Sequence, residues 1–530
     1  MQLRRARNQA KAWREGAAEA PAVGFFGRAQ AGKTRLISAL TSGENPALTV
    51  SLAGENLDYA AHINPDHQSA GLAIRFSRRA VVEDADFPIQ LSLLGEVDIL
   101  RILALAFLLD CRHDGIRPAA DDKEIANRLR ALALQRQSEP VAGIDGDDVV
   151  ELWDFLTRHD KHGQQPLAAQ FWPGALALCP YLAIDDRARL FSLLWGDVPA
   201  LTEAYRRFAH ALSLLDGARK VLAPRAVLMD DTGLPADALL DAMAFAAAGT
   251  SADPAVSVRP LVEGDAASPV ALSLAELNFI AAELSLSLAR SDVENLSRLA
   301  DMVDFPGYGG GLDAGRPETL LPAGSSLAPF ADAIARAKSL CLLERYAEHG
   351  QNPLLLVCTA AQAPSEAKSV GLSLKYWVKL TQGENSRLRG AHKPGLIWAL
   401  SEYDPRSTQT RHCDDAVQRY VGRPGDSWGT VLVTDDRGIS RMAGHLKAEI
   451  DANLRQDHIA ESLRRMRWEL GQCFAGWYNA LEPDDEKHKE HIAEILLKTL
   501  QARAGVHGEL LEHLLPERSV FNQLFFAASR

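Results

Sequence analysis

Apolar residues follow different spacings along this chain, and the changes of spacing divide it into regions. The apolar run of residues 22–26 opens onto a glycine-rich loop, and helical spacing follows from residue 35. Residues 72–77 and 87–93 alternate apolar with polar or small side chains, which is typical of half-buried strands. This part of the chain predicts a strand, a glycine loop, a helix and two further strands.

Helical spacing dominates the next part of the chain. Segments within residues 94–222 repeat apolar residues three to four positions apart and are separated by Pro and Gly. We therefore predict a helical insertion over residues 94–222. We also predict a basic N-terminal helix over residues 1–20 and an almost wholly helical C-terminal region over residues 436–530.

Strand patterns return after the insertion and alternate with helical spacing. Strands that alternate with helices favour a mainly parallel sheet covered on both faces. We predict long helices around residues 272–288 and 330–348. The predicted strands lie at residues 255–262, 299–303, 353–359, 395–400 and 429–434.

The glycine loop matches the pattern G-x-x-x-x-G-K-[ST] in full. In this pattern backbone amides surround phosphate oxygens, the Lys supplies positive charge to the β- and γ-phosphates, and the hydroxyl binds Mg²⁺. A strand before the loop and a helix after it are the context that the pattern requires. A glycine turn without a ligand is the alternative. The predicted phosphate-binding residues are Gly27, Arg28, Ala29, Gln30, Ala31, Gly32, Lys33 and Thr34, with Thr34 also a metal ligand.

Asp304 is the second candidate because it ends an apolar strand and opens a D-x-P-G sequence. Its carboxylate would hold Mg²⁺ through water, and the amide of Gly307 would face a γ-phosphate. Asp301 is a weaker alternative that we expect to cap or pair locally. A third metal ligand should come from the loop before residue 72, where Ser69 is the main candidate and Thr49 the second. No water-positioning residue is identifiable.

A base-reading motif is the third element of a GTPase site. Residues 401–404 read Ser-Glu-Tyr-Asp and follow the predicted strand at 395–400, where GTPases carry N/T-K-x-D. Asp404 is placed to accept hydrogen bonds from guanine. Glu402 puts an anion where the motif has a cation, which weakens guanine recognition, so a polar turn without base contact is the alternative.

Several segments of the chain together resemble the SrfC-type virulence factor family of bacteria, which is similar to dynamin-like and other P-loop GTPases. The resemblance covers about residue 22 to about residue 500. It implies a nucleotide-binding switch or motor in the bacterial cytoplasm that acts with proteins encoded beside it. Members of the family carry a Thr and a Lys where this chain has Ala70 and Glu402. The segments are VGFFGRAQAGKTRLISAL, INPDHQSAGLAIRFSRR, LADMVDFPG, LLERYAEHGQNPLLLVC and DDRGISRMAGHL.

Composition narrows the range of partners. The chain has 57 Lys and Arg against 69 Asp and Glu, a net charge of −12, and no long basic block, which argues against a nucleic-acid partner. Its 6 cysteines form no C-x-x-C pair, which indicates a reducing compartment such as the cytoplasm. The longest apolar run is too short to cross a membrane. A basic amphipathic stretch at residues 463–470 is expected to pack on the nucleotide domain, with contact to an anionic membrane as the alternative.

Together these observations predict an α/β P-loop NTPase of the GTPase type with a mainly parallel sheet. Its nucleotide domain would comprise residues 21–93 and 223–435, with the helical insertion between them. The predicted function is a GTP-dependent switch or slow GTPase that uses Mg²⁺ and protein partners, and an oligomer is compatible with it. A degenerate scaffold that does not hydrolyse nucleotide, or an ATPase, are the alternatives.

Overall fold

The structure is a computed structural model of the 530-residue chain. Contacts divide the chain into a large unit, Met1 with Leu3–Ala460, and a second unit, Gln2 with Glu461–Arg530. The structure describes residues 1–27, 32–41, 47–65, 70–79, 84–111, 121–230, 233, 237–262, 264–289, 295–307, 327–351, 353–360, 374–382, 395–401, 431–433, 435–451, 454–478, 494 and 497.

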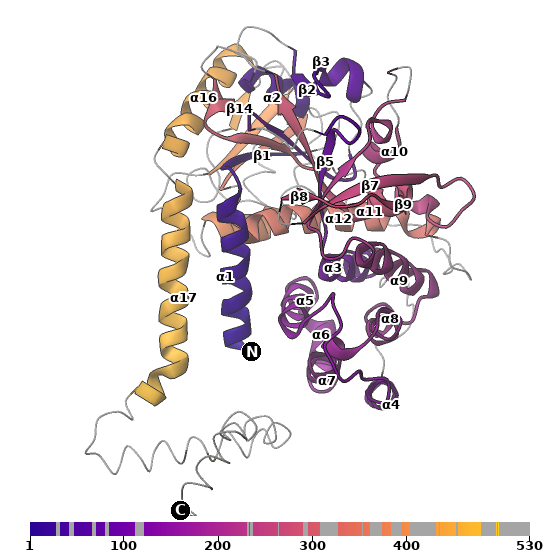
Figure 1. Cartoon of the computed structure of the whole chain (residues 1–530). Coiled ribbons are helices and arrows are strands. Elements are labelled where there is room, and N and C mark those ends of the chain that lie inside the picture. The colour runs from indigo at the N-terminus through magenta and orange to yellow at the C-terminus, as the bar shows by residue number, and fades with distance from the viewer. Residues whose placement is uncertain are drawn as a thin grey trace, which may run out of the picture. The chain divides into compact units, whose positions relative to one another are not determined.

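One sheet runs through the large unit (Figure 1). Its strands follow the order β14-β13-β12-β1-β11-β4-β10-β5-β6-β7-β8, and β2, β3 and β9 pair beside this path. The strands are β1 (Ala22–Gly27), β2 (Thr49–Leu52), β3 (Glu55–Asp58), β4 (Ala73–Ser77), β5 (Ile89–Leu93), β6 (Lys220–Ala223), β7 (Ala255–Val262), β8 (Asp265–Ala266), β9 (Val270–Ser273), β10 (Ala281–Leu288), β11 (Asp301–Asp304), β12 (Leu354–Ala360), β13 (Leu396–Ser401) and β14 (Val431–Val433).

The strands from β14 to β11 run parallel to one another. β1 lies between β11 and β12, and all its residues are buried, as expected for a parallel strand covered on both faces. The chain leaves β11 on one side of β1 and enters β12 on the other, so the strand order reverses at β1. In open α/β sheets, ligands bind at the carboxyl ends of the strands where such a reversal occurs.

The other half of the sheet departs from the predicted arrangement. β4 is antiparallel to β11, β5 is antiparallel to β10, and β6 and β7 continue the antiparallel pairing. Only β4 and β10 are parallel there. The sheet is therefore mixed, and the prediction of a mainly parallel sheet is wrong. An alternating pattern such as that of β7, which has one more buried and one more exposed face, identifies a strand. It does not determine whether that strand runs parallel or antiparallel to its neighbours.

The predicted long helix around residues 272–288 is also wrong. Ser273 begins only a short helix, α11 (Leu274–Ile280), through a capping box with Glu276. The chain then continues as β10, which pairs with β4 on one side and β5 on the other. Short apolar segments are compatible with either state, and here the two neighbouring strands satisfy the backbone.

Helices occupy most of the described residues in the stretch that the pattern predicts to be helical, up to β6. α5 illustrates the cause: Asp145 and Asp148 form a capping box at its start, and apolar residues along one face are buried. In Figure 1 these helices gather on one side of the sheet. They are α3 (Glu96–Ala106), α4 (Asp122–Ala133), α5 (Gly146–His159), α6 (Lys161–Leu167), α7 (Phe171–Leu178), α8 (Ile184–Phe191) and α9 (Pro199–Ser213), and we call them the helical region.

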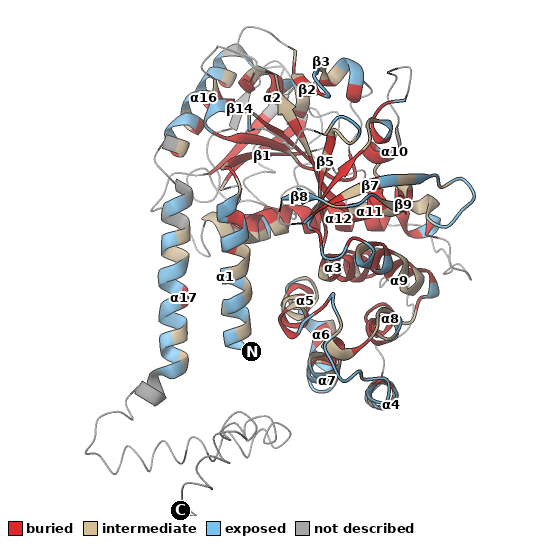
Figure 2. Ribbon diagram, viewed as in Figure 1, coloured by how far each residue is buried: buried red, intermediate tan, exposed pale blue. Residues whose placement is uncertain are grey.

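The remaining helices include the predicted N-terminal helix, the helix after the glycine loop and the helix at residues 330–348. Figure 2 shows that the buried residues concentrate in the sheet and in the inward faces of the helices around it. None of the described helices combines the length and apolar character that crossing a membrane requires. These helices are α1 (Gln2–Ala18), α2 (Lys33–Thr41), α10 (Asp237–Leu240), α12 (Ala331–Glu348), α16 (Asp436–Asp451) and α17 (Leu454–Tyr478).

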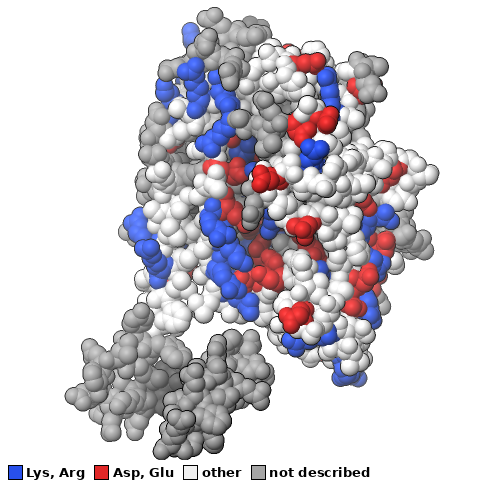
Figure 3. Space-filling view, viewed as in Figure 1, with Lys and Arg blue, Asp and Glu red and all other residues white. Residues whose placement is uncertain are grey.

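The basic side chains of α1 bind acidic side chains of α5. Arg5 makes two hydrogen bonds of 2.7 Å to Asp154, and Lys11 Nζ lies 3.2 Å from Asp147 Oδ2. Figure 3 shows the Lys and Arg side chains of α1 as a column with Asp and Glu side chains beside it. The basic N-terminal helix is therefore fixed to the helical region by charge.

Candidate functional site

β1 ends at a position that only glycine tolerates. Gly27 has a φ of 149°. A Cβ on Gly27 would lie 2.1 Å from the carbonyl oxygen of Cys358 on the neighbouring strand β12. An L side chain would be strained there and would also overlap backbone. The first glycine of the motif thus lets the chain leave the sheet in direct contact with β12.

The second half of the motif begins helix α2. Gly32 has a φ of 80°, and its carbonyl accepts a hydrogen bond of 3.0 Å from the amide of Leu36. Lys33 and Thr34 occupy the first turn of the helix. Amides in the first turn of a helix lack intrahelical partners, and the helix dipole adds positive potential there, so this end attracts anions.

The side chain of Lys33 connects α2 to the end of β11. Its Nζ lies 2.7 Å from Asp304 Oδ1 and donates a hydrogen bond of 2.6 Å to the carbonyl oxygen of Phe305. Lys33 is only 3% exposed. A buried ammonium needs anionic or dipolar partners, and residues far away in the sequence supply both of them.

Asp304 is the acidic partner of this lysine, and burial affects the pKa of its carboxyl group. Burial raises the pKa of the Asp304 carboxyl, and the positive charge of Lys33 opposes that rise. The parallel pairing of Phe25 with Asp304 and the hydrogen bond of 2.9 Å from the amide of Phe305 to the carbonyl of Phe25 fix the carboxylate beside β1. Both candidate residues therefore lie at the carboxyl edge of the parallel strands.

The segment after Asp304 is attached to helix α12. Ser339 Oγ donates a hydrogen bond of 2.8 Å to the carbonyl oxygen of Pro306, and Ser339 is buried. Gly307 is the last residue described in this segment. The D-x-P-G sequence is thus anchored at its proline by a side chain that lies more than thirty positions further along the chain.

Sequence reasoning missed three groups around this site. They are the Phe305 carbonyl, the Cys358 carbonyl and the phenol of Tyr59. Burial and the negative charge of Asp304 raise the pKa of Tyr59, and burial raises the pKa of the Cys358 thiol to about 12. Backbone carbonyls leave no signal in a sequence, and Tyr59 lies in a segment without any motif.

The other predicted residues fall into two groups. Thr49 lies in β2 and pairs with Asp58 of β3, while Asp301 forms a buried ion pair of 3.1 Å with Arg75 at the opposite end of β11 from Asp304. Ala70, where the family has Thr, is buried. The residues that lie outside the described part of the chain are Arg28, Ala29, Gln30, Ala31, Ser69, Glu402 and Asp404.

The donors at this site would hold a metal only together with a ligand. Among the described residues, no three His, Cys, Asp or Glu side chains are grouped so as to bind a metal ion. Thr34 and Asp304 offer one hydroxyl and one carboxylate. Mg²⁺ usually takes one or two protein ligands and completes its shell with substrate phosphates and water. The two donors therefore fit Mg²⁺ that arrives with a phosphate group.

These features define a mixed α/β protein in which the start of α2 and a buried Lys–Asp ion pair lie at the carboxyl edge of the parallel strands. The model of the family described as "Putative bacterial virulence factor" matches residues 1–414 and 406–530, which together span the chain. The chain belongs to this family. No curated protein matches it.

Proposed function

We propose that this chain is a P-loop NTPase of the GTPase type that acts as a nucleotide-dependent switch with slow hydrolysis. The description of its family names an association with virulence and no chemistry, so the proposal rests on the site. The observation that carries it is the position of the buried Lys33 ammonium, which lies against Asp304 and the Phe305 carbonyl.

An exchange of partners at Lys33 explains how this site would take nucleotide. The β- and γ-phosphate oxygens would replace the Asp304 carboxylate as the anions that face the ammonium. Asp304 would then be free to hold Mg²⁺ through water, while Thr34 supplies its hydroxyl. The exchange leaves each buried charge with a partner of opposite sign, which is the condition for burying charges at low cost.

The arrangement of the strands supports the same proposal. The end of β1, the start of α2 and the end of β11 share the edge at which the strand order reverses. That edge is where open α/β sheets bind ligands. The resemblance to SrfC-type proteins, and through them to dynamin-like GTPases, adds the expectation of a cytoplasmic switch that acts with proteins encoded nearby.

We expect slow hydrolysis because Ala70 occupies the position at which a switch threonine is expected. Ala70 is buried and has no hydroxyl to bind Mg²⁺ or to close over a γ-phosphate. Phosphoryl transfer depends mainly on positioning and charge stabilisation, so the loss of one ligand slows it. The same residue favours the second candidate function, a scaffold that binds nucleotide without hydrolysing it. In the proposed site Asp404 reads the guanine base.

Thermal unfolding with GTP, ATP or GDP, each with Mg²⁺, tests the proposal. A ligand at about 100 times its Kd stabilises the folded state by about 2.7 kcal/mol. We expect a larger rise in Tm with GTP than with ATP, and its loss in Lys33→Ala. Lys220→Ala is the matched control, because it removes a lysine from a partly exposed ion pair with Glu19. Equal shifts with GTP and ATP would remove guanine selectivity, and no shift would favour a scaffold without nucleotide.

A further inference from the structure

Helix α12 is attached at its middle to the segment that follows Asp304. Ser339 binds the Pro306 carbonyl, and the neighbouring Lys338 Nζ donates a hydrogen bond of 2.7 Å to the carbonyl of Asn278. Both side chains are 2% exposed. A displacement of the Pro306 carbonyl would therefore act directly on α12 through a buried hydrogen bond.

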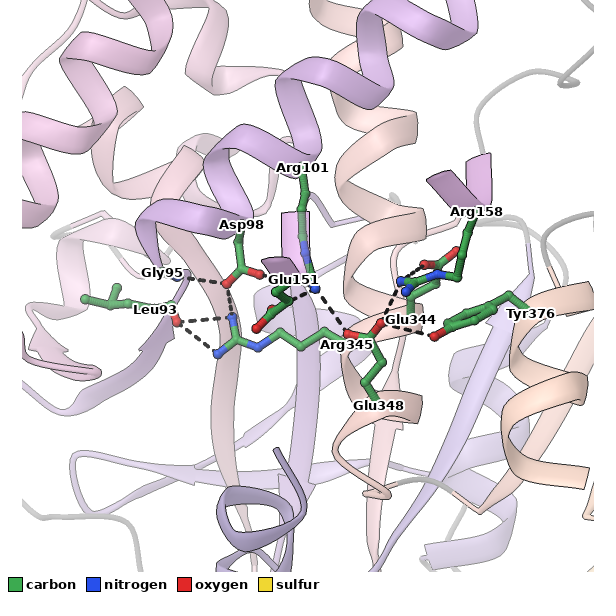
Figure 4. A network of polar contacts seen from close by, with 10 residues as sticks. All are labelled: Leu93, Gly95, Asp98, Arg101, Glu151, Arg158, Glu344, Arg345, Glu348 and Tyr376. Atoms are coloured by element: carbon green, nitrogen blue, oxygen red, sulfur yellow. Dashed lines mark hydrogen bonds and ion pairs between the residues drawn. The ribbon is translucent and has the colours of Figure 1, made fainter. Parts of the chain in front are cut away.

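The C-terminal end of α12 reaches the helical region through charged side chains (Figure 4). Arg345 Nη1 lies 2.8 Å from Asp98 Oδ2 at the start of α3. Asp98 also accepts a hydrogen bond of 2.8 Å from the amide of Gly95, which caps α3. The guanidinium of Arg345 thus attaches α12 to the first turn of α3.

Glu348 provides the second attachment and contacts two helices. Its carboxylate lies 3.3 Å from Arg101 of α3 and 2.7 Å from Arg158 of α5, and Tyr376 donates a hydrogen bond of 3.2 Å to it. Arg101 continues the chain of contacts to Glu151 of α5 at 2.7 Å. These charges lower the pKa of Glu348 despite its burial, so it is an anion at neutral pH.

A cavity of about 600 Å³ lies among these groups, bounded by α1, α3, α5 and the end of α12. Charged side chains therefore line the contact between the C-terminal end of α12 and the helical region, whereas the earlier turns of α12 share the apolar core with α3. Asp148 and Glu151 both line the cavity, so Arg101 has alternative carboxylates within the same space. Ion pairs around a cavity can exchange partners, whereas close-packed apolar contacts resist continuous deformation.

Helix α1, which is connected to the glycine loop through β1, reaches the same cavity. α1 precedes β1 and is bound to α5 through Arg5 and Lys11. A Cβ on Gly16 of α1 would lie 1.8 Å from the carbonyl oxygen of His349, directly after α12. Two connections from the proposed phosphate site therefore meet at the cavity. One runs through β1 to α1, and the other runs through Pro306 to α12.

We propose that α12 transmits the filling of the phosphate site to α3 and α5 through this charged junction. Ser339 is the positioning residue at one end, and Glu348 is the ionic contact at the other. The inference rests on the proposed function, because nucleotide binding is the event that separates Lys33 from Asp304. A rigid helix can carry a shift of about 1–2 Å between two sites, and the ion pairs around Arg101 then change partners.

Hydrogen–deuterium exchange of the full chain, with and without Mg²⁺ and GTP, tests the inference. In the wild type we expect slower exchange in α2 and a change of about twofold or more in α3 and α5. Ser339→Ala and Glu348→Gln should keep the response in α2 and lose it in α3 and α5. Arg101→Lys retains the cation opposite Glu348. It should therefore keep part of the response in α3 and α5 that a neutral side chain at position 101 would lose.

The control and the contradicting outcomes are distinct. Glu203→Gln removes a carboxylate from a surface ion pair of the helical region with Arg206 and should behave as the wild type. Unchanged responses of α3 and α5 in both variants, or a wild-type response confined to α2, would overturn the inference and leave the proposed function intact. No response even in α2 would overturn the proposed function, and this inference with it.

Discussion

Lys33 and Asp304 form an ion pair, with 2.7 Å between Nζ and Oδ1, that joins the first turn of α2 to the end of β11. Both side chains are largely buried, so removing either charge leaves the other without its partner. The carboxylate neutralises the ammonium, and under the proposed function it would compete with an incoming phosphate for it. Each group would therefore have a different partner in the proposed nucleotide complex from the one it has in this structure.

Replacing Asp304 separates these two roles. In Asp304→Asn the lysine loses its competing anion, so nucleotide affinity in EDTA is expected to rise about tenfold, in line with a charge-assisted hydrogen bond. With Mg²⁺ the affinity should fall by about the same factor, because metal support is lost. Titration with a fluorescent GTP analogue measures both conditions. Asp185→Asn, at an exposed position, is the control. Changes in the same direction with and without Mg²⁺ would contradict the exchange of partners.

Gly27 and Gly54 form a matched pair for testing the close contact at the end of β1. Gly27→Ala would place a Cβ 2.1 Å from the Cys358 carbonyl, whereas Gly54, also at positive φ, has nothing within 4 Å. We expect Gly27→Ala to lower the free energy of unfolding by more than about 3 kcal/mol, and Gly54→Ala by only about 1 kcal/mol. Urea denaturation measures both values. Similar losses would mean that the sheet accommodates the added methyl group.

The charged cavity predicts an unusual pH dependence at Asp148. Burial raises the pKa of Asp148 to about 7, whereas an aspartate in the unfolded chain has a pKa of about 3.9. The native state binds this proton more tightly, so ionisation of Asp148 lowers stability as pH rises from about 4 to about 7. Asp148→Asn keeps an acceptor for the amide of Asp145 and should be about 1–2 kcal/mol more stable than the wild type at pH 8.

Urea denaturation of Asp148→Asn and the wild type at pH 5 and pH 8 provides the measurement. The advantage of the variant should shrink or vanish at pH 5. An advantage of the same size at both values would assign it to something other than the titration of Asp148.

Lys338 predicts a pH dependence of the opposite sign. Burial lowers its pKa to about 7, well below the value of about 10.4 in an unfolded chain. Between these values the unfolded state binds more protons, so the contribution of Lys338 makes stability rise with pH. In Lys338→Met that part of the rise should be absent. Unfolding free energies at pH 7 and pH 9.5 test this, and parallel pH profiles for the two proteins would show that Lys338 does not titrate there.

The parallel strands are well predicted by the sequence because both of their faces are buried. Residues 22–26, 353–359 and 395–400 are nearly unbroken apolar runs, and each becomes a strand of the parallel half. The prediction of a long helix at residues 272–288 failed because a short capped helix and an alternating strand follow each other there without a break. The directions of the antiparallel strands depend on pairing partners distant in sequence, which a pattern along the chain does not contain.

The candidate site, like the fold, could be predicted from the sequence only in part. Strand ends indicate that Lys33 and Asp304 belong to one edge of the sheet, and the structure brings them into contact. Their mutual neutralisation, the Phe305 carbonyl and the anchor through Ser339 are contacts between distant segments, and none has a motif. The junction around Glu348 could not be predicted from the sequence either, because each of its charged residues comes from a different part of the chain and no motif links them.

Equilibrium binding of fluorescent GTP and ATP analogues with Mg²⁺, to the wild type and to Lys33→Ala, tests the central claim most directly. The account predicts saturable binding that prefers guanine, and a loss of at least about tenfold in affinity in the variant, because the ammonium is the cation that faces the phosphates. Binding that is equally tight in the variant, or no binding of either nucleotide to the wild type, would contradict a phosphate site at Gly27–Thr34.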